Sequence, residues 1–133
     1  MAISNIRVLL PYDLEKVWSI VISQNNYKWR SDLSYIEVLE DGNRFVEHTK
    51  DGYATEFKIT SMKQMSRYEF DMDNANMHGH WVGIFSKEQG GCLVDFTENV
   101  TAKKIIMKPF VKGYLKKQQA TYIADLKRAL EQD

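Results

Sequence analysis

Residues 79–100 have the sequence GHWVGIFSKEQGGCLVDFTENV, in which two strand-like runs meet at Gly90-Gly91. Glycine accepts backbone angles that other residues avoid, so this pair is typical of a turn. Strands joined by a short turn lie antiparallel in a sheet. Within residues 92–101, alternate positions are apolar except for Glu98. Because alternate side chains of a strand share a face, the sequence predicts a hairpin with one core-facing side and a carboxylate on that side.

The residues before this hairpin predict further strands of the same sheet. Asp41-Gly42 and Asp51-Gly52 suit tight hairpin turns, and residues 73–76 mark another turn. The predicted strands are residues 3–10, 34–40, 44–50, 54–62, 66–73, 77–87 and 92–101. Consecutive hairpins predict that these seven strands form an antiparallel sheet.

Two amphipathic stretches predict helices. After Pro11 and the candidate N-cap Asp13, apolar residues recur at helical spacing within residues 14–22. Residues 25–33 fit either a second short helix or an ordered loop. The sequence predicts one long helix somewhere within residues 103–131, whose apolar stripe comprises Val111, Leu115, Tyr122, Leu126, Ala129 and Leu130.

Two residues bear on how the long helix begins. Pro109 fits the first helical turn, or it kinks a helix that began near residue 103. Gly113 costs about 1 kcal/mol relative to alanine inside a helix. It either permits close approach to a strand or simply weakens that end of the helix.

Length and composition predict one soluble domain, residues 1–133, with a real core. Eighteen basic and eighteen acidic residues cancel, so no overall field attracts nucleic acid or a membrane. No segment has the roughly 20 apolar residues that span a bilayer, and the N-terminus lacks a signal-peptide pattern. The single cysteine, Cys92, excludes an internal disulfide and fits a reducing compartment. We therefore expect a cytoplasmic protein, without stable membrane insertion and without a nucleic-acid partner, whose oligomeric state is open.

Three stretches together resemble a known superfamily: PYDLEKVWSIV at residues 11–21, YKWRSDLSYIEVLEDGNRFVE at residues 27–47, and the hairpin at residues 79–100. Followed by the long terminal helix, they are similar to the START-like superfamily, also called SRPBCC or polyketide cyclase/dehydrase-like. The resemblance implies an α+β helix-grip fold: a curved seven-stranded antiparallel sheet around the C-terminal helix, with one or two short helices after the first strand. It also implies a cavity between sheet and helix. Gly91-Cys92 departs from the Gly-Thr pair that members often carry, and the short chain favours a small cavity.

Polar residues interrupt the apolar faces at two places. Glu98 lies among core-facing residues, where a carboxylate must be paired, hydrogen-bonded or protonated. It is a candidate polar anchor or acid/base in the cavity; alternatively the strand end is exposed and Glu98 is solvated. Gln118 and Gln119 interrupt the stripe of the long helix. Gln119 is a candidate ligand contact, unless a slightly rotated helix brings these amides to water.

Aromatic residues come from every part of the proposed fold. We predict that Trp29, Phe57, Trp81, Tyr114 and Tyr122 line the cavity, where tyrosine hydroxyls can orient a ligand. Trp18 and Phe96 are better explained as core, and filling the core is the alternative for the others as well.

Histidines and lysines each allow a functional and a structural interpretation. His78 and His80 share one side of a strand and could bind a metal with His48, but a polar outer face is the better interpretation. We therefore expect no metal and no cofactor. Six lysines cluster near the start of the long helix: Lys103, Lys104, Lys108, Lys112, Lys116 and Lys117. Such a cluster could contact anionic lipid or nucleic acid, although it is usually a solvated face.

Three functions are compatible with these features. The first is a binding module for a small apolar or amphipathic ligand, such as a lipid, polyketide or aromatic metabolite. Glu98, Gln119, Tyr114 and Tyr122 would orient the ligand, and the loop carrying Trp29 could gate access. The second is a cyclase- or aromatase-type enzyme using the same cavity. The third is a protein-interaction module with a filled core and an exposed apolar patch.

Overall fold

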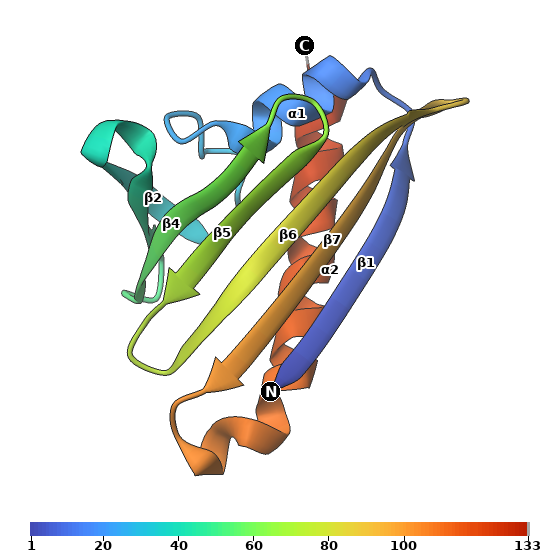
Figure 1. Ribbon diagram of the computed structural model, residues 1–133. Helices are drawn as coiled ribbons and strands as arrows, with labels where there is room; N and C mark the ends of the chain where they lie inside the picture. The colour runs from blue at the N-terminus through green and yellow to red at the C-terminus, as the bar shows by residue number, and fades with distance from the viewer. Residues whose placement is uncertain (133) are drawn as a thin grey trace.

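Seven antiparallel strands form one sheet in the order β1-β7-β6-β5-β4-β3-β2 (Figure 1). The structure is a computed structural model and describes residues 1–132. Its strands are β1 (Ala2–Leu10), β2 (Leu33–Leu39), β3 (Arg44–Thr49), β4 (Ala54–Lys63), β5 (Arg67–Asp73), β6 (Met77–Glu88) and β7 (Gly91–Ala102). These bounds confirm the seven strands predicted from the sequence. The prediction succeeded because turn residues separate the strands and interrupt the alternating pattern.

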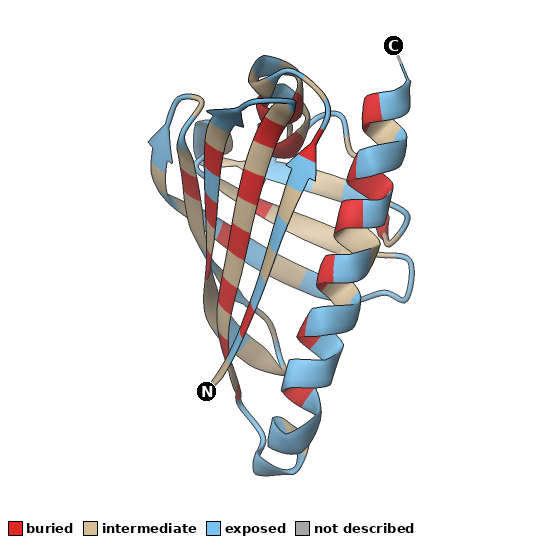
Figure 2. Ribbon diagram, turned by 90° about the vertical axis from the view of Figure 1, so that its right-hand side faces the viewer, coloured by how far each residue is buried: buried red, intermediate tan, exposed pale blue. Residues whose placement is uncertain are grey.

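The sheet bends around α2 (Lys108–Glu131), which packs against its concave face (Figure 1). α1 (Leu14–Ile22) crosses one end of the strands. The buried residues of α2 form a stripe towards the sheet (Figure 2), and they are Val111, Leu115, Gln119, Ile123, Asp125, Leu126 and Leu130. This arrangement confirms the helix-grip fold. None of the described helices combines the length and apolar character needed to cross a bilayer.

Strand β7, which lies between β1 and β6, shows why the sheet has a distinct inner face. Its residues alternate strictly between partly and fully buried along residues 91–102, and Phe96 is among the most deeply buried side chains. Trp18 of α1 packs edge-on against Phe85 of β6, with ring centroids 4.9 Å apart. Trp18 and Phe96 therefore belong to the core, as predicted, and they anchor α1 and α2 to the same sheet face.

One local expectation differs from the structure. Asp41-Gly42 was expected in a tight hairpin turn, but it lies in a short 3-10 helix, η1 (Glu40–Gly42). Asp41 has φ of 56° and Gly42 has φ of 91°, so β2 and β3 still run antiparallel through this longer turn. Residues 23–32 form a loop, which is one of the two alternatives that the sequence left open. Asp13 occupies the N-cap position of α1, but its side chain makes no capping hydrogen bond to the described residues.

The start of α2 follows a second 3-10 helix, η2 (Ile105–Met107). Pro109 lies in the first helical turn, which is the first of the two alternatives that the sequence allowed. Gly113 is exposed, and a Cβ built there has no atom within 4 Å. Close approach to a strand is therefore not its role. Gly113 simply leaves the backbone of this turn less restricted than another residue would.

We expect Gly113→Ala to raise the free energy of unfolding by about 0.5–1 kcal/mol, because alanine restricts the unfolded chain and favours the helix. Urea denaturation followed by circular dichroism measures this change. Gly83→Ala is the matched control, because a Cβ at Gly83 would clash with the indole of Trp81 and lower the free energy of unfolding. A neutral or destabilising effect of Gly113→Ala would show that this turn has tertiary contacts after all.

Candidate functional site

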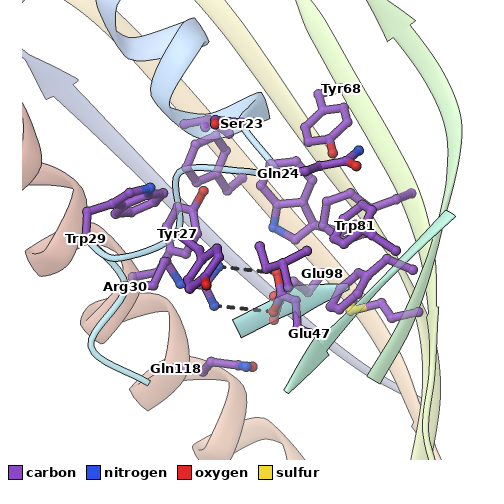
Figure 3. A pocket seen from close by; sticks show the side chains of 18 of the residues that line it. Ser23, Gln24, Tyr27, Trp29, Arg30, Glu47, Tyr68, Trp81, Glu98 and Gln118 are labelled. Carbon is purple, nitrogen blue, oxygen red and sulfur yellow. Dashed lines mark hydrogen bonds and ion pairs between the residues drawn. The ribbon is translucent and has the colours of Figure 1, made fainter. Parts of the chain in front are cut away.

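A cavity of about 100 Å³, partly open to solvent, lies between the concave face of the sheet, α2 and the loop of residues 23–32 (Figure 3). Its wall is largely aromatic. The aromatic residues that line it are Tyr27, Trp29, Phe45, Phe57, Tyr68, Phe70, Trp81, Phe96 and Tyr122. These rings come from most strands of the sheet, from the loop and from α2, so the cavity depends on the complete fold.

Ring stacking across neighbouring strands builds the floor of the cavity. Phe45 and Phe57 are paired across β3 and β4 and stack with centroids 4.9 Å apart. Phe70 and Trp81 are paired across β5 and β6 and stack at 4.8 Å. Phe57 and Phe70 meet edge to face at 5.1 Å, which joins the two stacks. The floor is thus a continuous apolar surface whose rings are held by one another.

An ion-pair cluster lies where the loop crosses the cavity (Figure 3). The guanidinium of Arg30 approaches both carboxylate oxygens of Glu47, at 3.4 and 3.5 Å. It also donates two hydrogen bonds to Asp32, each 3.1 Å long. Arg30 lies over the ring of Tyr122, 4.9 Å from its centroid. Burial disfavours the charged form of Arg30, but the effect of these neighbours is larger than that of burial. The pKa of Arg30 therefore lies above its ordinary value.

Glu98 projects from β7 beside this cluster (Figure 3). Its side chain is 8% exposed, and its Oε2 atom has no hydrogen-bond partner within residues 1–132. Burial raises the pKa of Glu98 to about 7; Arg30 opposes this shift and Glu47 adds to it. A buried, unsatisfied carboxyl oxygen is costly, so its position at a cavity wall calls for an explanation.

Gln119 is buried in α2, but its amide is already bonded within the protein. Ser4 donates its hydroxyl to Gln119 Oε1 at 2.7 Å, and Gln119 Nε2 donates to the backbone oxygen of Ser4 at 3.2 Å. A longer contact of 3.5 Å joins Nε2 to the backbone oxygen of Phe96. These bonds fasten α2 to β1, so Gln119 is committed to holding the fold together.

The loop of residues 23–32 is fastened to α2 from outside the cavity. Asp125 accepts hydrogen bonds from the backbone N–H and the hydroxyl of Ser31, both 2.8 Å long, and it pairs with Arg128. Burial opposes ionisation of Asp125, but the hydrogen bonds from Ser31 and Arg128 have the larger effect. They hold the pKa of Asp125 below its usual value. The ring of Trp29 contacts Tyr122 edge to face at 5.3 Å. The loop is therefore held against α2 at both Trp29 and Ser31.

This architecture matches solved structures over almost the whole chain. A START superfamily protein from Mycobacterium smegmatis has a TM-score of 0.89 to it at 13% sequence identity, and the match covers 99% of each chain. The protein has a START-like, helix-grip fold. A conserved protein from Geobacillus kaustophilus gives a TM-score of 0.82 at 13% identity, covering 97% of this chain and 95% of the other.

DynU16, a protein of the dynemicin biosynthetic locus, shares the START-like fold with a TM-score of 0.81 at 12% identity. That match covers 99% of this chain and 48% of DynU16. No family model and no curated protein matches the sequence. At such low identities the solved structures show the fold, and the chemistry of the cavity must be argued from its own residues.

The START-like cavity brings together six of the seven residues predicted to bind a ligand, and they are Trp29, Phe57, Trp81, Glu98, Gln119 and Tyr122. Gln118 lines it too. Tyr114 was expected there as well, but it is half-exposed and is not one of the lining residues. It lies one helical turn before Gln118, where the helix has passed the end of the cavity.

Arg30 and Glu47 are the functional candidates that the sequence analysis missed. Glu47 shares the inner face of β3 with Phe45, two residues earlier. The alternation that identified Glu98 could therefore have identified Glu47 also. Arg30 lies in a loop without periodicity, and no sequence signal pointed to it.

The histidines lie away from the cavity of this START-like fold. His80 is hydrogen-bonded to Asp71 at 2.6 Å and to Glu69 at 2.9 Å on the outer face of the sheet. His48 stacks on Tyr35 with centroids 4.1 Å apart. Among residues 1–132, no group of three or more His, Cys, Asp or Glu side chains is arranged to hold a metal ion.

Proposed function

We propose that this protein binds a compact, mainly apolar molecule in the cavity, and that the molecule presents a hydrogen-bond donor to Glu98. The observation that carries the proposal is the buried Oε2 atom of Glu98, which has no partner among the described residues and lies in an aromatic-lined cavity. A ligand donor there would satisfy the oxygen, and apolar burial would supply affinity at roughly 25 cal/mol per Å². Residues 1–133 would act as one domain in this function.

The volume of the cavity limits the size of the ligand. About 100 Å³ is well below the roughly 300–1,000 Å³ of pockets that enclose drug-sized molecules. Of the ligand classes compatible with the fold, a single aromatic ring or a short chain fits best. A longer lipid or polyketide would extend into solvent or require the loop of residues 23–32 to move.

The fixed charges around the cavity limit the chemical class of the ligand. The positive charge of Arg30 is met by Glu47 and Asp32, which leaves Glu98 as a surplus carboxyl group. A ligand carboxylate would therefore meet a like charge without a free cation. A hydroxyl or a protonated amine would donate to Glu98 and complement it, and the aromatic wall suits an amine further.

A cyclase- or aromatase-type reaction in the same cavity is the second candidate. It is favoured by the pKa of Glu98, which at about 7 suits proton exchange near neutral pH. Burial also raises the pKa values of Tyr68 and Tyr122, so their hydroxyls stay protonated and can donate to a ligand oxygen. Glu98 would then transfer the proton while the tyrosines orient the reacting chain.

Binding of three matched probes tests the first proposal. Benzylamine, benzyl alcohol and benzoate share one ring and differ in the polar group. We expect the amine and the alcohol to bind at least tenfold more tightly than benzoate, by quenching of the fluorescence of Trp29 and Trp81, which line the cavity. Glu98→Gln should abolish the preference for the amine, whereas the exposed control Glu88→Gln should retain it.

Two outcomes would contradict ligand binding: none of the probes binds at millimolar concentration, or Glu98→Gln leaves the order of affinities unchanged. Native mass spectrometry of the purified protein provides an independent measurement, with an expected adduct of low mass. If the retained molecule is converted on incubation, and Glu98→Gln keeps it bound but unconverted, the enzymatic candidate replaces the binding module.

A further inference from the structure

Large apolar side chains project into solvent at the start of α2, where η2 and the first helical turns extend beyond the sheet (Figure 1). Ile105 is 81% exposed, Ile106 is 77% exposed and Phe110 is 72% exposed. Tyr114 continues the same exposed series one turn further along. Consecutive isoleucines so far out of the core are unusual, and such groups mark a contact surface.

These residues contribute little to folding, because others from the same segment do the packing. Val111 and Leu115 are buried against Val100 and Ala102 of β7, and Met107 packs against this cluster. In Figure 2 this end of the helix is mostly exposed, with its few buried residues turned to the sheet. Ile105, Ile106 and Phe110 therefore form a second apolar face of the segment.

Lysines surround this apolar face. Residues 103–117 contain Lys103, Lys104, Lys108, Lys112, Lys116 and Lys117, and no acidic residue occurs between Glu98 and Asp125. All six are exposed. Only Lys103 forms an ion pair with another described residue, a 2.7 Å contact to Asp73. A protein of net charge zero thus concentrates positive charge around a group of highly exposed apolar side chains.

We propose that residues 103–114 form a docking surface for an anionic lipid membrane, with Ile105, Ile106 and Phe110 inserted at the interface and the lysines on the headgroups. Apolar side chains flanked by lysines match the surface of an anionic membrane. The apolar side chains would contact the acyl chains, and the lysines would contact the anionic headgroups. A second copy of the chain would bring its own lysines to the same place and be repelled. Nucleic acid would use the lysines but would leave the isoleucines exposed.

The docking surface is separate from the proposed ligand cavity. Ile105, Ile106 and Phe110 do not line the cavity, and Glu98 is not part of the surface. The contact is peripheral, because only side chains enter the membrane. Failure of one proposal therefore leaves the other standing, and each has its own measurement.

Co-sedimentation of the intact chain with vesicles tests this inference. The vesicles are of phosphatidylcholine alone or of phosphatidylcholine mixed with phosphatidylserine. We expect binding to the mixed vesicles, weakening as salt rises, and little binding to phosphatidylcholine alone. Ile105→Ser with Ile106→Ser should lower the affinity by at least roughly tenfold, because both apolar side chains are removed from the interface. Lys108→Glu with Lys112→Glu should reduce it to the level of neutral vesicles.

Exposed residues elsewhere provide matched controls. Ile84→Ser removes an exposed isoleucine of β6, and Lys58→Glu with Lys87→Glu reverses two exposed lysines outside the segment. These variants should bind the mixed vesicles like the unmodified chain, and circular dichroism checks that each variant is folded. The inference is overturned if the mixed vesicles do not sediment the chain at low salt, or if the isoleucine variant binds them undiminished. It is also overturned if a single-stranded oligonucleotide or an acidic peptide binds the segment more tightly than the vesicles and independently of the isoleucines.

Discussion

Replacing Arg30 with methionine is expected to lower the free energy of unfolding by about 3 kcal/mol at neutral pH. The guanidinium is the cation for Glu47 and Asp32, and its side chain and that of Glu47 are largely buried. Removing it leaves the carboxylate of Glu47 in an aromatic-lined cavity without a positive partner. The same change releases the loop of residues 23–32 from β3. Urea denaturation measures the loss.

Two comparisons separate the buried charge from a general effect of substitution. Arg7→Met removes an arginine that is 62% exposed and 3.6 Å from Asp95, and it should cost no more than about 1 kcal/mol. Adding Glu47→Gln to Arg30→Met should recover much of the stability, because position 47 then no longer holds a buried carboxylate without its cation. Equal losses for Arg30→Met and Arg7→Met would show that the Arg30 cluster is hydrated and contributes little.

The fold was predictable because its strands and helices follow simple periods. The alternation in residues 92–101 identified the inner face of β7, and the stripe of Leu115, Leu126 and Leu130 identified the inner face of α2. Each pattern has one cause, burial on one side. The alternation also found Glu98, since a charged residue at a core-facing position stands out against its neighbours.

The site was only partly predictable, because its boundary depends on how the elements are placed in space. Tyr114 and Tyr122 both lie on α2 and were both predicted to line the cavity, although only Tyr122 belongs to the apolar stripe of the helix. In the folded protein Tyr122 lines the cavity, whereas Tyr114 is half-exposed and lies outside it. Arg30 lies in a loop, where position follows from contacts such as that of Ser31 with Asp125. These contacts join residues far apart in the chain, so local patterns could not reveal them.

Glu98 gives the second large effect, and its sign follows from its pKa. Burial raises that pKa from 4.5 to about 7, so between these values the folded protein holds a proton that the unfolded chain has released. The free energy of unfolding therefore falls as pH rises through this window. A shift of this size corresponds to about 3 kcal/mol, at roughly 1.4 kcal/mol per pKa unit. Above about pH 7 the stability of the folded protein is lowered by the full free-energy cost of burying the ionised carboxylate of Glu98.

Glu98→Gln removes the titrating group, so the variant should be about as stable as the unmodified chain near pH 4 and about 3 kcal/mol more stable near pH 8. Urea denaturation across this range measures the difference, and Glu88→Gln, exposed to solvent, should show no such divergence. If the free energy of unfolding of Glu98→Gln changed with pH in parallel with that of the unmodified chain, the carboxyl group of Glu98 would be solvated. A variant that gains stability while losing the amine preference would instead show that Glu98 destabilises the fold and serves the ligand, because unfolding could not explain the lost binding.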